Sequence, residues 1–252
     1  MPKHCKHTAN FNCSFDKIFG SFQKNNLKFN NKIIYNLTMN KKTRSPLDNL
    51  ISSIDEIRLL IESNQKKEFR ENPAKDTPEN DLTTSEKSHA AALMRINHAG
   101  EVAAQGLYQG HAVFTDNLSI KNQMEEAADE ELDHLNWCKE RVEELGEKTS
   151  RFSPVWYAGS FIIGAASGYF GDKWSLGFIE ETEKQVSDHL TKHLNLLPEK
   201  DEKSRRIVEQ MRIEEEEHGE NAKKAGAAKL PEFIRNTMKI TSKIMTKTAY
   251  YF

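Results

Sequence analysis

Two Glu-x-x-His pairs have the residue types and the spacing that could bind metal ions. They are Glu131 with His134 and Glu215 with His218, in a sequence of 252 residues. Side chains three positions apart lie on one face of a helix, so each pair can offer a carboxylate and an imidazole to the same site. A single pair arises by chance in a chain with 38 acidic residues, and then belongs to a solvated helix face.

Both pairs interrupt stripes of apolar residues, which favours metal binding over a solvated face. Steps of three and four residues define the first stripe, Ile120, Met124, Ala127, Glu131, His134, Cys138, Val142 and Leu145. The same steps define the second stripe, Val208, Met211, Glu215, His218, Ala222 and Ala225. This periodicity predicts two core-facing helix sides. It also selects Glu215 from the run of four glutamates at 214–217, although Glu214 could orient a histidine by a hydrogen bond.

Two further glutamates complete a candidate ligand set. Glu183 is the single acid on a third stripe, Leu176, Ile179, Glu183, Val186, Leu190, Leu194 and Leu197. Glu101 lies on a less apolar face, formed by Met94, His98, Glu101, Gln105, Tyr108 and Ala112. Periodicity therefore supports Glu101 least. Four carboxylates buried with two imidazoles need about four positive charges, which two divalent cations supply.

This ligand set indicates a di-iron centre in a helical bundle. Ferritin-like di-iron proteins use one glutamate from each of two helices and a Glu-x-x-His from each of the other two. Carboxylate and imidazole ligands suit iron or manganese. Cys5, Cys13 and Cys138 form no Cys-x-x-Cys, which argues against a thiolate zinc site and against a disulfide framework. We therefore predict two iron ions (Fe²⁺/Fe³⁺) per chain.

The other polar residues on these helices have simpler interpretations. His98, one turn before Glu101, is expected to support the site or to pack in the core. Tyr108 could line a cavity, and Cys138 is expected to be a small core residue. Three more histidines are expected at the surface or between helices: His111, His189 and His193.

Four long helices must position these residues. The periodicity predicts them at about 85–114, 119–145, 173–197 and 201–228, with a further amphipathic helix after Pro231. Another amphipathic helix is predicted at 47–63, behind a Ser45-Pro46 start, and a loop at 72–80. The predicted fold is all-α: a ferritin-like four-helix bundle with additional N-terminal, membrane-facing and C-terminal helices.

Composition excludes some functions. The net charge is −2, from 36 basic and 38 acidic residues, so nucleic-acid binding is not supported. The most apolar segment is 154–170, which is shorter than a membrane span. It fits either a buried core helix or a surface that dips into a membrane. Its small residues would allow close helix packing or self-association in lipid: Gly159, Gly164, Ala165 and Gly168.

The first 38 residues differ from the rest of the chain. They are rich in Lys, Asn and Phe, and Asp16 is their only acid. A mitochondrial presequence would be equally poor in acids but rich in arginine, and this stretch has none. The alternative is that Met39 is the true start and that the preceding residues are an artefact or a disordered tail. We assign 1–44 as an extension and 45–252 as the ferritin-like di-iron domain.

Four motifs in order resemble the demethoxyubiquinone hydroxylases of ubiquinone biosynthesis. They are LMRINHAGEVAAQGLYQG, EELDHL, GFIEETEKQV and EEEEHGENA. The resemblance runs from about Ser45 to Phe252 and is closest to the bacterial members. It implies a di-iron monooxygenase that uses O₂ and two reducing equivalents to hydroxylate the ring of a polyprenylated demethoxyubiquinol. The family's iron ligands then fall on the residues already selected: Glu101, Glu131, His134, Glu183, Glu215 and His218.

The resemblance also implies a location and partners. A polyprenyl quinol resides in the bilayer, so the segment Trp156–Phe170 is expected to contact the membrane through Trp156, Tyr157, Phe161, Ile162 and Ile163. The expected location is the cytoplasmic face of the bacterial inner membrane, or alternatively the matrix side of the mitochondrial inner membrane. Other ubiquinone-biosynthesis proteins and a second copy of the chain are further possible partners. A ferritin-like iron-storage or peroxide-scavenging protein is the competing function.

Overall fold

The computed structural model describes residues 69–115 and 117–252. Within them the chain forms six helices and no strand. The helices are α3 Thr84–Ala112, α4 Leu118–Glu144, α5 Ser153–Tyr169, α6 Asp172–Leu196, α7 Glu202–Lys224 and α8 Glu232–Tyr251. Every helix predicted within this range is confirmed, and 72–80 is a loop, also as predicted. The predicted helix at 47–63 lies outside the described residues.

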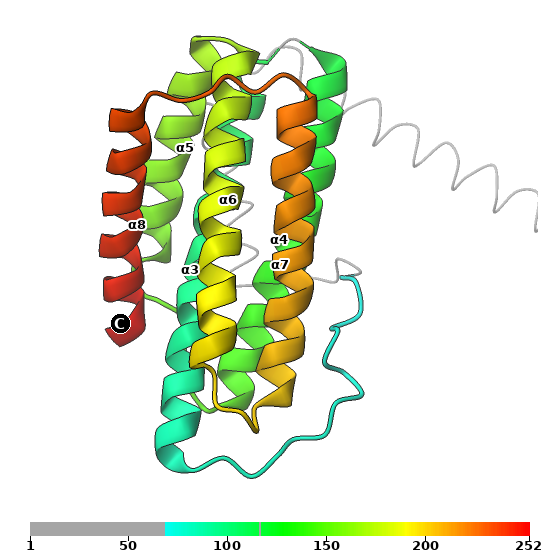
Figure 1. Cartoon of the computed structure of the whole chain (residues 1–252), viewed down its shortest axis with the longest axis vertical. Helices are drawn as coiled ribbons and strands as arrows, with labels where there is room; N and C mark the ends of the chain where they lie inside the picture. Colours follow the sequence, from blue (N-terminus) through cyan, green and yellow to red (C-terminus); the bar gives the residue numbers. More distant parts are fainter. Residues whose placement is uncertain (1–68, 116) are drawn as a thin grey trace, which may run out of the picture. The chain divides into compact units, whose positions relative to one another are not determined.

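The architecture is a ferritin-like four-helix bundle. Helices α3, α4, α6 and α7 run alongside one another, with α3 packed on α4 and α6 packed on α7 (Figure 1). Helices α5 and α8 cover the side of α3 and α6 that faces away from α4 and α7. The all-α prediction is therefore confirmed, and α5 and α8 are additional helices outside the four-helix bundle.

Two apolar layers fill the bundle, and the predicted ligands lie between them. One layer contains the residues Met94, Trp137, Cys138, Val142, Leu190, Ile207, Val208 and Met211. The other contains Ala104, Leu107, Tyr108, Met124, Leu176, Ile179 and Ala222. On each of the four helices, the candidate ligands fall between the positions that belong to these two layers. The bundle thus holds a polar layer in the middle of its core.

Helix ends use local hydrogen bonds that the sequence encodes. Thr83 and Glu86 form a capping box at the start of α3. Gly146 follows the C-terminus of α4, and there Glu147 N–H donates to the Val142 carbonyl at 3.0 Å. Gly146 has φ 84°, a left-handed conformation that glycine adopts without strain. Gly226 follows the C-terminus of α7 in the same way, so both helices that carry a Glu-x-x-His pair share one type of C-terminus.

Glycines bring the backbones of α3 and α5 into direct contact. A Cβ atom at Gly110 would lie 2.3 Å from the Phe161 carbonyl oxygen, and one at Gly164 would lie 2.2 Å from the Leu107 carbonyl oxygen. Real Cβ atoms do not approach backbone so closely, so these positions must be glycine. Close helix packing through Gly164 and Gly168, one of the two roles predicted for them, is thus confirmed within this chain.

We expect Gly164→Ala to destabilise the protein by about 1–3 kcal/mol, because the added methyl forces two packed helices apart. Gly159→Ala is the matched control in the same helix, since a Cβ there meets nothing within 4 Å. An alanine in a helix interior should leave stability unchanged or raise it by up to about 1 kcal/mol. Thermal unfolding of both variants checks the prediction, and equal effects would contradict it.

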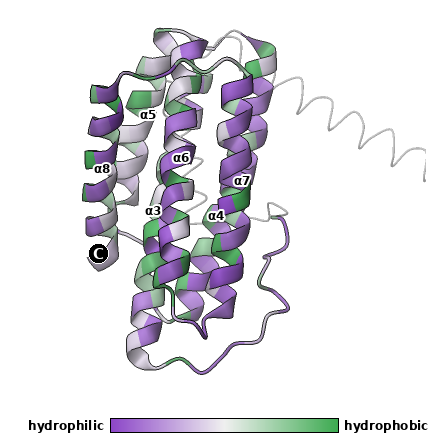
Figure 2. Cartoon of the chain, in the orientation of Figure 1, coloured by the Kyte–Doolittle hydropathy of each residue, from purple (hydrophilic) through white to green (hydrophobic). Residues whose placement is uncertain are grey.

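The surface of the two extra helices differs from that of the bundle. Figure 2 shows α7 mostly hydrophilic, whereas α5 is pale to hydrophobic along its length. Large apolar side chains are exposed on α5 and α8, including Val155, Ile162, Phe233, Ile240 and Ile244. None of the helices in the described part of the chain is both long and apolar enough to cross a membrane.

Candidate metal centre

The six predicted ligands are buried together in the polar layer. Their exposed fractions run from 0% for Glu131, His134 and Glu183 to 7% for His218. One ligand atom from each of four residues lies within 4.8 Å of the others: Glu101, Glu131, His134 and Glu215. His218 Nδ1 joins them at 3.1 Å from a Glu131 oxygen. Glu183 contacts Glu215 and receives a hydrogen bond from the Tyr108 hydroxyl at 2.9 Å.

Glu131 and Glu215 each lie close to both histidines. Glu131 oxygens are 3.5 Å from His134 Nδ1 and 3.1 Å from His218 Nδ1. Glu215 shows the reverse, 3.1 Å to His134 and 3.5 Å to His218. Each carboxylate therefore reaches both halves of the centre, whereas Glu101 lies 4.0 Å from His134 Nδ1.

Several donor atoms of the centre have no hydrogen-bond partner. Buried oxygens without a hydrogen bond occur on Glu101, Glu131, Glu183 and Glu215, and His218 Nδ1 is in the same condition. Buried polar groups normally have partners, since leaving one unpaired costs about 1–3 kcal/mol. Unpartnered carboxylate oxygens that converge with imidazole nitrogens fit the coordination of iron or manganese. The residues present thus fit a metal pair.

The pKa shifts of the buried glutamates also indicate that this site suits cations. Burial raises the pKa of Glu101 well above the usual carboxyl value, and repulsion from Glu131 and Glu215 adds to this. Burial and the same two carboxylates also raise the pKa of Glu183. A cluster with these shifts takes up protons when no cation compensates its charge.

Nearby carboxylates also shift the pKa values of the two histidines. Burial lowers the pKa of His218, but contacts with Glu131 and Glu215 outweigh it and raise the pKa to about 12. The pKa of His134 is likewise raised well above its usual value, despite burial, by Glu131, Glu214 and Glu215. Metal ions would have to displace these protons, so metal affinity should fall as pH falls.

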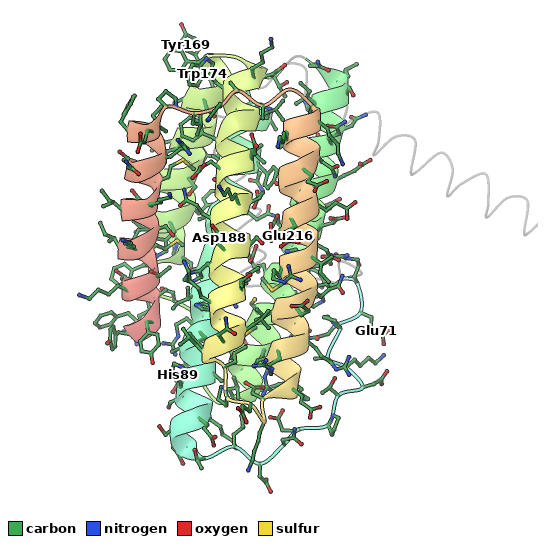
Figure 3. The ribbon with its side chains drawn as sticks, in the orientation of Figure 1. Glu71, His89, Tyr169, Trp174, Asp188 and Glu216 are labelled. Atoms are coloured by element: carbon green, nitrogen blue, oxygen red, sulfur yellow. The ribbon has the colours of Figure 1, made fainter. Side chains whose placement is uncertain are left out.

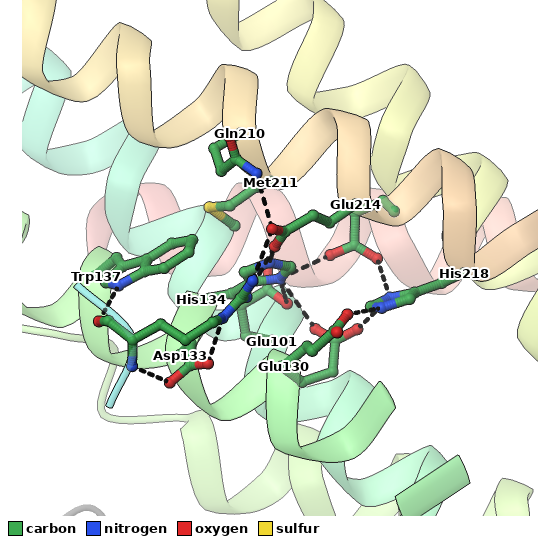
Figure 4. Close-up of polar contacts among 12 residues, drawn as sticks. Glu101, Glu130, Asp133, His134, Trp137, Gln210, Met211, Glu214 and His218 are labelled. Carbon is green, nitrogen blue, oxygen red and sulfur yellow. Dashed lines mark hydrogen bonds and ion pairs between the residues drawn. The ribbon is translucent and has the colours of Figure 1, made fainter. Parts of the chain in front are cut away.

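A second carboxylate holds the outer nitrogen of each histidine. Glu214 lies 2.5 Å from His134 Nε2, and Glu130 lies 2.7 Å from His218 Nε2. Each of these glutamates directly precedes the Glu-x-x-His of the opposite helix, so the support is crossed between α4 and α7. By binding the outer nitrogen, each carboxylate leaves Nδ1 directed at the centre (Figure 4).

A cavity of about 900 Å³ reaches the centre from the side of α5 and α8. Glu101 is part of its lining, together with residues of α3, α5, α6 and α8. Most of the lining is apolar, as expected for a site that binds a hydrophobic molecule. The lining also includes Trp156 and His189, each of which has a buried nitrogen without a hydrogen bond. Burial lowers the pKa of His189 to about 4, so this imidazole is neutral near pH 7.

The residues predicted to contact a membrane fall into three groups. Trp156 and Ile163 line the cavity. Tyr157 and Phe161 are buried, and Tyr157 donates a hydrogen bond to Gln109 at 2.7 Å. Ile162 points outward, with 67% of its surface exposed, and Ile163 is also exposed, at 42%. Figure 3 shows Tyr169 and Trp174, both exposed, at the end of the bundle where α5 meets α6.

The other histidines with predicted positions, and Cys138, lie in the core or beside the cavity. His98 and Cys138 are buried core residues. Two histidines lie between helices: His111 contacts Ser175, and His193 Nδ1 lies 2.7 Å from Asn97. His189 lines the cavity and meets the His193 ring of the same helix edge-on. Glu214 does orient a histidine, as considered possible. Glu130 was not predicted, although it stands in the same position before its pair as Glu214 does.

The fold and site define a class: a ferritin-like helical bundle with a buried glutamate–histidine cluster that could hold metal. Residues 88–249 match the family described as "Ubiquinone biosynthesis protein COQ7", and the chain belongs to that family. A protein of Legionella pneumophila (strain Paris) named "3-demethoxyubiquinol 3-hydroxylase" is 48% identical over 211 residues, which cover 83% of this chain and 99% of the relative.

Two further relatives carry the same name. That of Polynucleobacter necessarius subsp. necessarius (strain STIR1) is 48% identical over 207 residues, 82% of this chain and 99% of the relative. That of Ralstonia pickettii (strain 12J) is 53% identical over 169 residues, 67% of this chain and 78% of the relative. The resemblance found in the sequence motifs is thereby confirmed.

Proposed function

We propose that this protein is a 3-demethoxyubiquinol 3-hydroxylase that acts in ubiquinone biosynthesis. In this reaction one oxygen atom of O₂ enters the quinol ring and the other leaves as water, with two reducing equivalents consumed. The observation that carries the proposal is the apolar cavity that ends at Glu101 of the carboxylate–histidine centre. We assign residues 45–252 as the catalytic domain.

The proposed ligands of two iron ions are the six buried residues Glu101, Glu131, His134, Glu183, Glu215 and His218. Glu131 and Glu215 suit a bridging role, because each contacts both histidines. Glu101 and Glu183 would complete the ligand set, since Glu101 contacts Glu131 and Glu183 contacts Glu215. When bound, the iron pair would supply the redox chemistry that O₂ activation requires.

The chain's own residues would bind and orient the quinol. An apolar lining favours the ring and the polyprenyl tail and excludes water, which protects a reactive centre from side reactions. The cavity is lined by α5 and α8, which leaves room for the tail to extend between these helices towards a membrane. A storage protein would need no such cavity, so the cavity favours the hydroxylase over the iron-storage alternative.

We further propose that α5 and α8 face a membrane, on the cytoplasmic side of the bacterial inner membrane or on the matrix side of its mitochondrial counterpart. Exposed apolar residues occur on both helices. Helix α8 also carries a basic residue at every fourth position: Arg235, Lys239, Lys243 and Lys247. A helix with an apolar face and a basic edge binds at the lipid interface.

We expect Ile162→Asp to weaken binding to phospholipid vesicles roughly 10-fold or more, because it places a charge where an apolar side chain would enter lipid. Ile213→Asp on α7 is the control, since Ile213 is also exposed but lies on the other side of the bundle. Co-sedimentation with anionic vesicles measures both. Equal loss in the two variants, or none in Ile162→Asp, would refute the proposed membrane face.

An anaerobic Fe²⁺ titration, followed by O₂ and demethoxyubiquinol, tests the enzymatic proposal. Two irons per chain and a hydroxylated quinol identified by mass spectrometry would support it. A chain that takes up many more than two irons without altering the quinol would instead support storage. A chain that binds no iron would refute both.

A further inference from the structure

The segment at 69–83, which we call the strap, runs beside α4 and α7 before α3 begins (Figure 1). Its polar side chains contact both helices or the turns beside them. Arg70 binds Asp133 and Glu214, Asn72 donates to Glu140, and Glu79 pairs with Arg141. The strap is therefore fixed to the bundle on the side opposite to α5 and α8.

Arg70 is the strap residue that comes nearest to the metal centre. Its guanidinium donates to Glu214 through two nitrogens, at 2.8 and 2.9 Å, and to Asp133 at 2.6 Å. Its backbone N–H also donates to Asp133, at 3.0 Å, and its carbonyl accepts from Trp137 at 3.3 Å. Paired hydrogen bonds of this kind fix the geometry of a carboxylate as well as its charge.

Both groups held by Arg70 touch the His134 ring. Glu214 lies 2.5 Å from His134 Nε2. Trp137 packs against the same imidazole in a tilted arrangement, with ring centroids 5.4 Å apart. The Arg70 guanidinium lies 5.0 Å from the centre of the Trp137 ring. Arg70 can therefore position the His134 ring through two neighbours, Glu214 by hydrogen bonds and Trp137 by ring packing.

The other half of the centre has no equivalent clamp. Glu130 supports His218 in the way that Glu214 supports His134, but 45% of its side chain is exposed, against 12% for Glu214. Among residues 69–115 and 117–252, no cationic side chain pairs with Glu130 except His218 itself. The two halves share the Glu-Glu-x-x-His sequence but differ in what holds the outer glutamate.

We propose that Arg70 is a positioning residue that makes the two metal positions unequal, with tight binding at His134 and weaker, exchangeable binding at His218. The inference rests on the proposed metal centre. Fixing Glu214 removes the need to order it when a metal binds, so less binding energy is lost on that side. The guanidinium does not repel the cation, because it is paired with two carboxylates and the trio remains negative.

A titration of the full-length chain with Co²⁺, read by visible absorption and calorimetry, tests this inequality. We expect two binding steps of different affinity. Arg70→Met should weaken the tighter step about 10–100-fold, the usual cost of losing an outer partner of a metal ligand, and leave the weaker step within about 3-fold. The affinity of the tighter step in Arg70→Lys should fall between those of the wild type and Arg70→Met, since an ammonium group cannot pair with Glu214 through two parallel bonds. Glu130→Gln should weaken the other step instead.

Arg212→Met is the matched control, because Arg212 pairs with Glu209 and Glu216 on the surface of α7 and touches neither histidine. Two equal steps in the wild type would overturn the proposal. So would unchanged binding in Arg70→Met, or an equal loss of both steps in a variant that folds normally by circular dichroism. Absence of any Co²⁺ binding in the wild type would refute the metal centre itself, which is a distinguishable failure.

Discussion

Glu215→Ala is expected to abolish hydroxylation and to prevent binding of the metal pair. Glu215 lies 3.1 Å from His134 and 3.5 Å from His218, so its loss removes a ligand from both halves of the centre. The decrease in metal affinity should exceed the 10–100-fold typical of outer partners, so we expect a loss of more than about 100-fold. Anaerobic Fe²⁺ titration and quinol hydroxylation measure the two effects.

The same variant should not be less stable than the wild type when both are metal-free. Glu215 is 1% exposed, has one oxygen without a hydrogen bond and repels the buried Glu101 and Glu183. In the absence of a cation these costs offset its contacts with the two histidines. Metal should then raise the melting temperature of the wild type but not of Glu215→Ala, because a ligand stabilises only a fold that binds it. This difference separates loss of the site from loss of the fold.

The run of glutamates at 214–217 provides the control. Glu217 is exposed, two positions further along the same helix, and should be replaceable by alanine without effect on metal or activity. Two bound metals in Glu215→Ala would contradict the ligand assignment. A comparable loss in Glu217→Ala would show that negative charge on this helix, rather than a ligand, is what matters.

Periodicity was sufficient to find most of the centre because α4, α6 and α7 each bury one face. On such helices an acid at a core-facing position stands out against apolar neighbours, and Glu131, Glu183 and Glu215 were selected in this way. Helix α3 is different. It packs against α4, α5, α6 and α8 and is buried almost all round, so no single stripe marks Glu101. Only the family resemblance made that assignment firm.

Features that depend on tertiary contacts could not be predicted from the sequence. Arg70 lies in a segment without periodicity, and its role follows from the path of the strap, which no local pattern encodes. The cavity depends on α8 lying across from α5, although the two helices are separated in sequence by α6 and α7. The apolar segment at 154–170 was recognised as unusual, but which of its residues turn inward depends on glycine contacts with α3.

Arg141→Met is expected to cause the largest loss of stability, about 3–5 kcal/mol, which corresponds to roughly 6–20 °C in melting temperature for a domain of this size. Arg141 is 1% exposed and lies on α4. It donates to Asp201 at 2.8 Å, to Ser204 at 2.9 Å, and to Glu79 of the strap at 2.6 and 3.0 Å. One side chain thus joins the strap, α4 and the start of α7.

The size of the stability loss in Arg141→Met depends mainly on Asp201. Its side chain is fully buried, whereas the side chains of Glu79 and Glu144, the other acidic partners of Arg141, are 44% and 47% exposed and can return to water. Removing the guanidinium leaves the Asp201 carboxylate uncompensated in the core, and that is the costly event. The exposed pairs of Arg212 should contribute less than about 1 kcal/mol, so Arg212→Met is the reference for a surface arginine.

A second substitution distinguishes this cause from simple loss of packing. Asp201 caps α7 by accepting a hydrogen bond from Ser204 N–H, and asparagine caps a helix about equally well without charge. Asp201→Asn in the Arg141→Met background should therefore restore much of the lost stability, although Asp201→Asn alone should destabilise the wild type. Denaturant unfolding of the four proteins gives the coupling energy. If the two losses simply add, the buried charge is not the cause, and Arg141 stabilises the fold by filling space between the strap and the bundle.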